Sequence, residues 1–69
     1  LRRQGVRRLW VTTTNDNLAA LAFYQRRGFR LQRLRPGAVD QTRLVKPSIP
    51  PLGDNGIPIR DEIDLCREL

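Results

Sequence analysis

The chain has 69 residues, enough for one small domain whose hydrophobic core is of marginal size. Its hydrophobic fraction of 39% is too high for a disordered chain, and its single cysteine, Cys66, excludes an intrachain disulfide. The sequence has no histidine, which argues against a structural zinc site, and no apolar run of the ~20 residues that a membrane-spanning helix needs.

The net charge of +6 is unevenly distributed along the chain. Residues 1–46 carry eleven basic and two acidic side chains, whereas residues 47–69 carry two basic and five acidic ones. A basic half either attracts phosphate, on nucleic acid or on a phosphorylated cofactor, or is a solvated arginine-rich face. We expect a cytoplasmic protein. Because the chain starts at Leu1 inside a basic, helix-like phrase, we also expect a fragment or a processed piece.

Residues 1–5 are predicted to form the end of a helix that stops at Gly5. The next segment, residues 8–14 (RLWVTTT), is rich in β-branched and aromatic residues, which is typical of a strand. Trp10 is expected to lie in the core. Asn15, Asp16 and Asn17 then offer side-chain oxygens that cap the free N–H groups of a following helix.

That helix is predicted over residues 18–27, and most of its surface is apolar. Such a helix is expected to be covered by a sheet on one side and by another element on the other. Arg26 and Arg27 lie in its last turn, where cations are favoured, and Gly28 supplies a left-handed cap.

A second strand is predicted over residues 29–35 (FRLQRLR). Its apolar–polar alternation slips at Leu34, which makes an edge position plausible. Pro36 and Gly37 end the strand, and residues 38–46 are compatible with a short helix within the connection 36–58.

The remaining residues are predicted to form a loop and a third strand. Residues 47–58 hold four of the five prolines and indicate an ordered loop. Residues 59–69 follow as the strand, with acidic side chains such as Asp64 on a solvated face. Cys66 is interpreted as a small packing residue, because no histidine is present to activate it as a nucleophile.

The order of the elements predicts the topology. A strand–helix–strand unit requires a right-handed crossover, so strands 8–14 and 29–35 should run parallel. The long connection lets the last strand, 59–69, return antiparallel between them. We therefore predict an α/β (α+β) fold in which one main helix covers a three-stranded mixed sheet.

The spacing N-x-x-A-x-x-x-Y-x-x-x-G-F, formed by Asn17, Ala20, Tyr24, Gly28 and Phe29, follows directly after a predicted strand. This arrangement resembles the C-terminal half of the GNAT family of N-acetyltransferases. The resemblance extends over residues 5–35, and the tail GIPIRDEIDL is similar to the last strand of many bacterial members.

The resemblance implies acyl transfer from acetyl-CoA to an amine. Tyr24 maps onto the family's tyrosine that points toward the coenzyme A sulfur and is often the general acid. Phenols keep their proton at neutral pH, which suits that role. Asn17, Ala20 and Tyr24 are then the predicted cofactor-binding residues, and no metal is implied. Without the resemblance, the residues also allow purely structural roles: Tyr24 as a core residue and Asn17 as a helix cap.

One departure from the family pattern limits the prediction for this chain. The family binds the pyrophosphate of the cofactor through a glycine-rich R/Q-x-x-G-x-G/A loop at the start of a helix. The 69 residues contain no such loop. We therefore expect the chain to be inactive alone, and to associate with itself or with a chain that carries the N-terminal half.

Two other functions stay open at this point. The first is a non-catalytic interaction module that keeps the half-fold for pairing. The second is a small basic nucleic-acid-binding domain, which is disfavoured because the one clear helix is apolar and offers no basic face for a groove.

Overall fold

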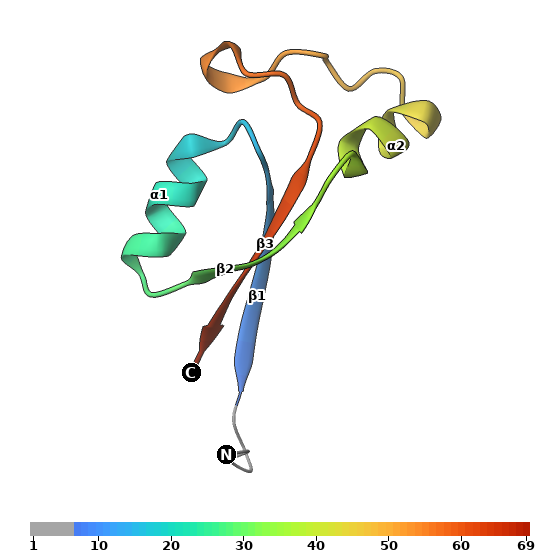
Figure 1. Cartoon of the computed structure of the whole chain (residues 1–69). Coiled ribbons are helices and arrows are strands. Elements are labelled where there is room, and N and C mark those ends of the chain that lie inside the picture. Colours follow the sequence, from blue (N-terminus) through green and yellow to red (C-terminus); the bar gives the residue numbers. More distant parts are fainter. Residues whose placement is uncertain (1–6) are drawn as a thin grey trace.

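The computed structural model describes residues 7–69, so the predicted helix end at residues 1–5 lies outside the described residues. Three strands and two helices form the fold (Figure 1). In chain order the elements are β1 (Arg8–Thr14), α1 (Leu18–Arg26), β2 (Arg30–Arg35), α2 (Ala38–Val45), the 3-10 turn η1 (Asp54–Gly56) and β3 (Glu62–Glu68).

The last strand begins at Glu62, three residues later than predicted. The reason lies in the hydrogen bonds of the preceding backbone. The N–H of Ile59 donates to the Pro51 carbonyl at 3.1 Å, and those of Arg60 and Asp61 donate to the side chain of Asn15. These three donors therefore hold the loop in place and do not join the sheet.

The strand order is β1-β3-β2, and both outer strands pair antiparallel with β3. The order and the strand directions agree with the prediction. The description of the sheet as mixed was wrong, because β1 and β2 run parallel to each other but never pair. Every hydrogen-bonded strand pair among residues 7–69 is antiparallel.

A β-bulge in β2 explains the slip in its alternation. The register of β2 on β3 shifts between Leu31 and Arg33, so Gln32 is the extra residue. As a result Leu31 lies opposite Leu65 and Leu34 lies opposite Ile63, which puts both leucines on the same face of the sheet.

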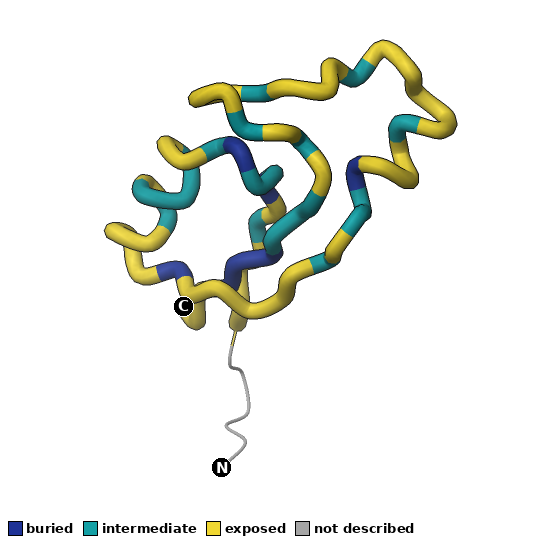
Figure 2. The backbone as a smooth tube through the Cα atoms, turned by 45° about the horizontal axis from the view of Figure 1, so that its top comes forward, coloured by how far each residue is buried: buried dark blue, intermediate teal, exposed yellow. Residues whose placement is uncertain are grey.

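The core is small, and Figure 2 shows that most of the backbone is exposed or half-buried. Leu65 of β3 is fully buried. Arg67 lies two residues after Leu65 in β3, so both side chains point to the same face of the sheet. The Arg67 side chain lies beside Gly28, which follows α1, and α1 therefore covers this face. Phe29 is also buried on this side, and its ring contacts Tyr24 of α1.

Two expectations about apolar residues were wrong. Trp10 is 48% exposed and lies outside the core, because it pairs with Cys66 on the face of the sheet opposite to α1. The helix α1 has no fully buried residue, and Leu18 and Phe23 remain exposed. Within the described part of the chain, one side of this helix thus lacks the second cover that its apolar surface predicted.

Candidate functional site

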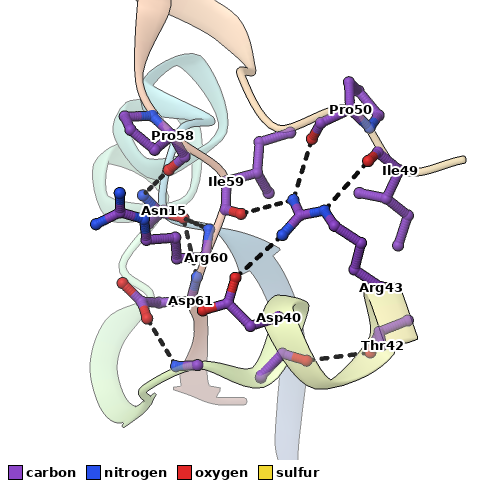
Figure 3. Close-up of polar contacts among 12 residues, drawn as sticks. Asn15, Asp40, Thr42, Arg43, Ile49, Pro50, Pro58, Ile59, Arg60 and Asp61 are labelled. Atoms are coloured by element: carbon purple, nitrogen blue, oxygen red, sulfur yellow. Dashed lines mark hydrogen bonds and ion pairs between the residues drawn. The ribbon is translucent and has the colours of Figure 1, made fainter. Parts of the chain in front are cut away.

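The turn between β1 and α1 is the point where the proline-rich loop meets the predicted site. Asn15 uses its whole side chain there (Figure 3). Its Nδ2 donates to the Pro58 carbonyl at 2.8 Å, and its Oδ1 accepts from the N–H groups of Arg60 at 3.0 Å and Asp61 at 3.1 Å. Asn15 was predicted as a possible helix cap, but its side chain binds the loop.

Asp16 fixes the same loop at a second point. Its carboxylate is buried, accepts a hydrogen bond from the Thr14 hydroxyl, and accepts another from the N–H of Asp54 at 2.9 Å. The Thr14 hydrogen bond, and with it the Asp54 N–H, holds the pKa of Asp16 below its usual value, although burial opposes the shift. Asp16 is therefore a structural carboxylate that ties the turn to the loop.

Arg43 of α2 clamps the loop from the other side (Figure 3). Its Nε donates to the Ile49 carbonyl at 3.2 Å, and its guanidinium also donates to the carbonyls of Pro50 at 3.0 Å and Ile59 at 2.8 Å. An ion pair with Asp40 at 3.0 Å uses the remaining nitrogen. The loop is thus held by side chains from both neighbouring elements.

Asn17 caps α1, as one of its two interpretations predicted. Its Oδ1 accepts the N–H of Ala20 at 3.0 Å, which satisfies one of the free donors in the first turn. Its Nδ2 makes no hydrogen bond to any residue between 7 and 69. The cap therefore leaves this amide donor free for a ligand, and the predicted cofactor-binding role of Asn17 stays a prediction.

Tyr24 lies near the end of α1 with its ring held between two aromatic neighbours. The ring makes edge contacts with Phe23 and Phe29, each with 5.2 Å between ring centroids. Its hydroxyl makes no hydrogen bond within the described part of the chain. Packing against these two rings thus orients the Tyr24 ring, and the hydroxyl stays available as a hydrogen-bond donor.

These two side chains define the candidate site. Asn17 is the N-cap of α1 and Tyr24 lies seven residues later, which corresponds to about 10 Å along the helix axis. Two hydrogen-bond donors in a row fit an elongated ligand with carbonyl acceptors. Among the described residues, no group of three or more His, Cys, Asp or Glu side chains is placed to hold a metal.

Asp64 was predicted on a solvated face, but it is buried and forms the centre of a polar cluster. It accepts hydrogen bonds from the Thr12 hydroxyl at 2.7 Å and from Arg35 at 2.8 Å, and Arg33 lies 3.8 Å away. The Thr12 hydrogen bond and the two arginines hold the pKa of Asp64 below its usual value, and burial opposes them. The cluster joins all three strands.

Three further expectations concern Cys66, membrane-spanning helices and the location of the protein. Cys66 is buried in β3, in line with its interpretation as a packing residue. No helix in residues 7–69 is long and apolar enough to cross a membrane. The cytoplasmic location stays a prediction.

The model of the acetyltransferase (GNAT) family matches residues 1–29, which contain Asn17, Ala20 and Tyr24. Two uncharacterized proteins of Bacillus subtilis (strain 168) are similar in sequence. YxbD is 54% identical over 68 residues, which are 99% of this chain and 43% of YxbD. YdhI is 52% identical over 56 residues, which are 81% of this chain and 35% of YdhI. The chain thus spans less than half the length of these relatives.

Two solved structures have the same arrangement of elements. One is a GNAT family acetyltransferase from Elizabethkingia anophelis with acetyl-CoA bound, with a TM-score of 0.74 and 31% identity. The other is the IAA acetyltransferase from Bacillus cereus ATCC 14579, with a TM-score of 0.71 and 34% identity. Each match covers 90% of this chain, but 37% and 38% of the two larger chains, respectively.

Proposed function

Because the chain belongs to the GNAT acetyltransferase family, as its sequence predicted, we propose that it forms part of an acetyl-CoA-dependent N-acetyltransferase. In this reaction the amine nitrogen attacks the thioester carbonyl, the C–N bond forms and the C–S bond breaks. The amine loses a proton and the leaving thiolate gains one. The observation that carries the proposal is the Tyr24 hydroxyl, which has no hydrogen-bond partner among residues 7–69 and lies two helical turns from Asn17.

Tyr24 is assigned the role of proton donor to the thiolate. Its ring is immobilised between Phe23 and Phe29, which lowers the cost of orienting the hydroxyl for proton transfer. The Nδ2 of Asn17 is assigned to a carbonyl of the pantetheine arm, because the cap bond uses the amide oxygen and leaves the nitrogen free. The residues present therefore fit the arm of the cofactor, which would supply the acetyl thioester.

The proposal does not extend to activity of the 69 residues alone. The chain spans 43% of YxbD, and its sequence has no glycine-rich phosphate loop. Its arginines provide an attraction for phosphate that is screened by salt. We expect isothermal titration of the chain with acetyl-CoA at physiological salt to give a dissociation constant weaker than the micromolar range. Micromolar binding would require a phosphate site elsewhere in the chain.

We further propose that β1 pairs with another strand, from a second copy or from a chain carrying the N-terminal half. Among the described residues, β1 pairs with β3 on one side only. Its sequence, RLWVTTT, has no proline or lysine that would protect the free edge. Analytical ultracentrifugation over a concentration series should detect association. A folded species that stays at 8.0 kDa at high concentration would contradict it.

The test of the enzymatic proposal is a chimera in which this chain replaces the matched segment of YxbD. Release of coenzyme A is measured with a thiol reagent over a panel of amines, next to YxbD itself and with acetyl-CoA affinity measured in parallel. Tyr24→Phe should lower kcat by about 10²–10⁴ at unchanged acetyl-CoA affinity. Gln25→Ala, an exposed neighbour, is the matched control and should leave kcat unchanged.

Each outcome discriminates between the functions considered. An unchanged kcat in Tyr24→Phe would reduce Tyr24 to a packing residue. A folded chimera that neither binds acetyl-CoA nor transfers acetyl groups, while YxbD does both, would refute the enzymatic proposal and favour a non-catalytic interaction module.

A further inference from the structure

The turn that joins β1 to α1 is attached to the proline-rich loop by the two residues that precede Asn17. Asn15 binds the loop backbone with both polar groups of its side chain, at distances from 2.8 to 3.1 Å. Asp16 accepts the backbone N–H of Asp54 at 2.9 Å. These partners lie 38 to 46 residues later in the sequence. The loop therefore sets the position of the turn and of the start of α1.

Asp16 lies at the centre of this attachment. The residue is only 5% exposed, and each of its carboxylate oxygens has its own partner. Oδ1 accepts the Thr14 hydroxyl, and Oδ2 accepts the Asp54 N–H. The loop backbone packs directly on the carboxylate, because a Cβ at Gly53 would lie 2.0 Å from the Asp16 Oδ2. The carboxylate is thus fixed by β1 on one side and by the loop on the other.

The backbone of Asp16 also belongs to the first turn that leads into α1. Its carbonyl accepts the N–H of Leu18 at 2.9 Å, and the N–H of Asn17 donates to the Thr14 carbonyl at 3.1 Å. The Oδ1 of Asn17 is held by the N–H of Ala20 at 3.0 Å. The Asn17 amide group, with its free Nδ2, is therefore held in one orientation next to a residue that the loop fixes.

We propose that Asp16 is a positioning residue for the candidate acyl-transfer site. It transmits the placement of the loop to the Nδ2 of Asn17 and thereby raises the affinity for acetyl-CoA. The inference rests on the proposed function, in which this Nδ2 donates to a carbonyl of the pantetheine arm. A hydrogen bond needs its donor and acceptor within about 3.2 Å, so a small displacement of the turn is enough to lose it.

The test measures acetyl-CoA affinity and kcat in the YxbD chimera. Asp16→Ala removes both carboxylate hydrogen bonds and should weaken acetyl-CoA binding about two- to tenfold, which corresponds to one neutral hydrogen bond. The kcat at saturating acetyl-CoA should change less than about twofold, because the Tyr24 ring is held by Phe29 at the other end of α1. An unchanged affinity would overturn the inference.

Two variants separate the hydrogen bonds from the charge of the carboxylate. Asp54→Ala is the matched control, because it removes an exposed carboxylate from the loop but keeps the backbone N–H that Asp16 accepts. It should change the affinity less than about twofold. Asp16→Asn should restore most of the affinity, since its amide can accept the Asp54 N–H and donate to the Thr14 hydroxyl. Equal losses in Asp16→Ala and Asp54→Ala would refute the positioning role.

A double-mutant cycle with Asn17→Asp separates positioning from a general loss of structure. Because Asp16 acts through the Asn17 amide, Asp16→Ala should cause no further loss of affinity once the Nδ2 donor is gone. Additive losses would overturn the inference, since Asp16 would then act by another route. Should Asp16→Ala fail to fold, Thr14→Val takes its place, because it removes only the hydroxyl bond to the carboxylate.

NMR spectra of the 69-residue chain report the positioning without the cofactor. The side-chain amide signals of Asn17 should shift in Gly53→Ala, which displaces the Asp16 carboxylate, but not in Gly56→Ala of the same loop. The amide signals of Gln25 serve as the reference within α1, and unshifted Asn17 signals in folded Gly53→Ala would refute the inference. A folded native chimera that does not bind acetyl-CoA would refute the proposed function and this inference together. An unchanged affinity in Asp16→Ala of a chimera that binds would refute this inference alone.

Discussion

Replacing Gly53 by alanine tests whether the loop is seated on Asp16 as closely as the structure indicates. A Cβ at Gly53 would lie 2.0 Å from the Asp16 Oδ2 and 2.6 Å from both the Asp16 Cγ and the Ile59 Cγ1. Ordinary contact begins at 3.4 Å, so the carboxylate oxygen would have to move by more than 1 Å. The backbone of Gly53 is extended, a conformation that alanine also adopts, so only the steric clash opposes the substitution.

Moving the Asp16 carboxylate would break one of its hydrogen bonds. The Asp16 Oδ2 accepts the N–H of Asp54 at 2.9 Å, and a displacement of more than 1 Å takes it beyond hydrogen-bond distance. Overpacking of this kind costs about 1–3 kcal/mol, and a lost hydrogen bond at a buried group adds about 1–3 kcal/mol. Removing a glycine from the unfolded chain returns about 0.4–1 kcal/mol. We expect Gly53→Ala to lower the free energy of unfolding by about 2–4 kcal/mol.

The assay is urea unfolding of the chain followed by circular dichroism, with Gly56→Ala as the control. Gly56 has a φ of +69° but no atom within 4 Å of its Cβ position, so its substitution tests backbone strain without a clash. Gly56→Ala should lower the free energy of unfolding by about 1 kcal/mol. A loss at Gly53 no larger than that at Gly56 would refute the close contact between the loop and Asp16.

Two further predictions concern single side chains. Asp64 has its pKa lowered in the folded chain, so its stabilising contribution is present above the unfolded value of about 3.9 and is lost as the pH falls through the lower folded value. Acid unfolding should therefore be less steep below about pH 4 in Asp64→Asn than in the native chain, and equal slopes would contradict the assignment. Asn17→Ala should cost about 1 kcal/mol through loss of the cap, measured by urea unfolding. Asn17→Asp keeps an acceptor oxygen and should therefore keep the free energy of unfolding. In the YxbD chimera the same substitution should weaken acetyl-CoA binding, because the Nδ2 donor is gone. An unchanged affinity would show that Asn17 acts only as a helix cap.

The sequence by itself determined the features that depend on near neighbours along the chain. The β-branched run of β1, the cap of α1 by Asn17 and the left-handed Gly28 after α1 are local, since each involves residues within one or two turns. The slip in alternation at Leu34 was also visible, and the bulge at Gln32 is its cause. The spacing from Asn17 to Phe29 carried the family resemblance.

Only the tertiary structure decided the roles of residues whose partners are far away in sequence. Asp64 is buried because Thr12, 52 residues earlier, and Arg35 supply its hydrogen bonds. Asn15 binds the backbone of a loop more than 40 residues later, instead of capping a helix. The exposure of Trp10 depends on which face of the sheet α1 covers. A local pattern cannot specify such choices, because they depend on which distant groups the folded chain brings within hydrogen-bonding or packing distance.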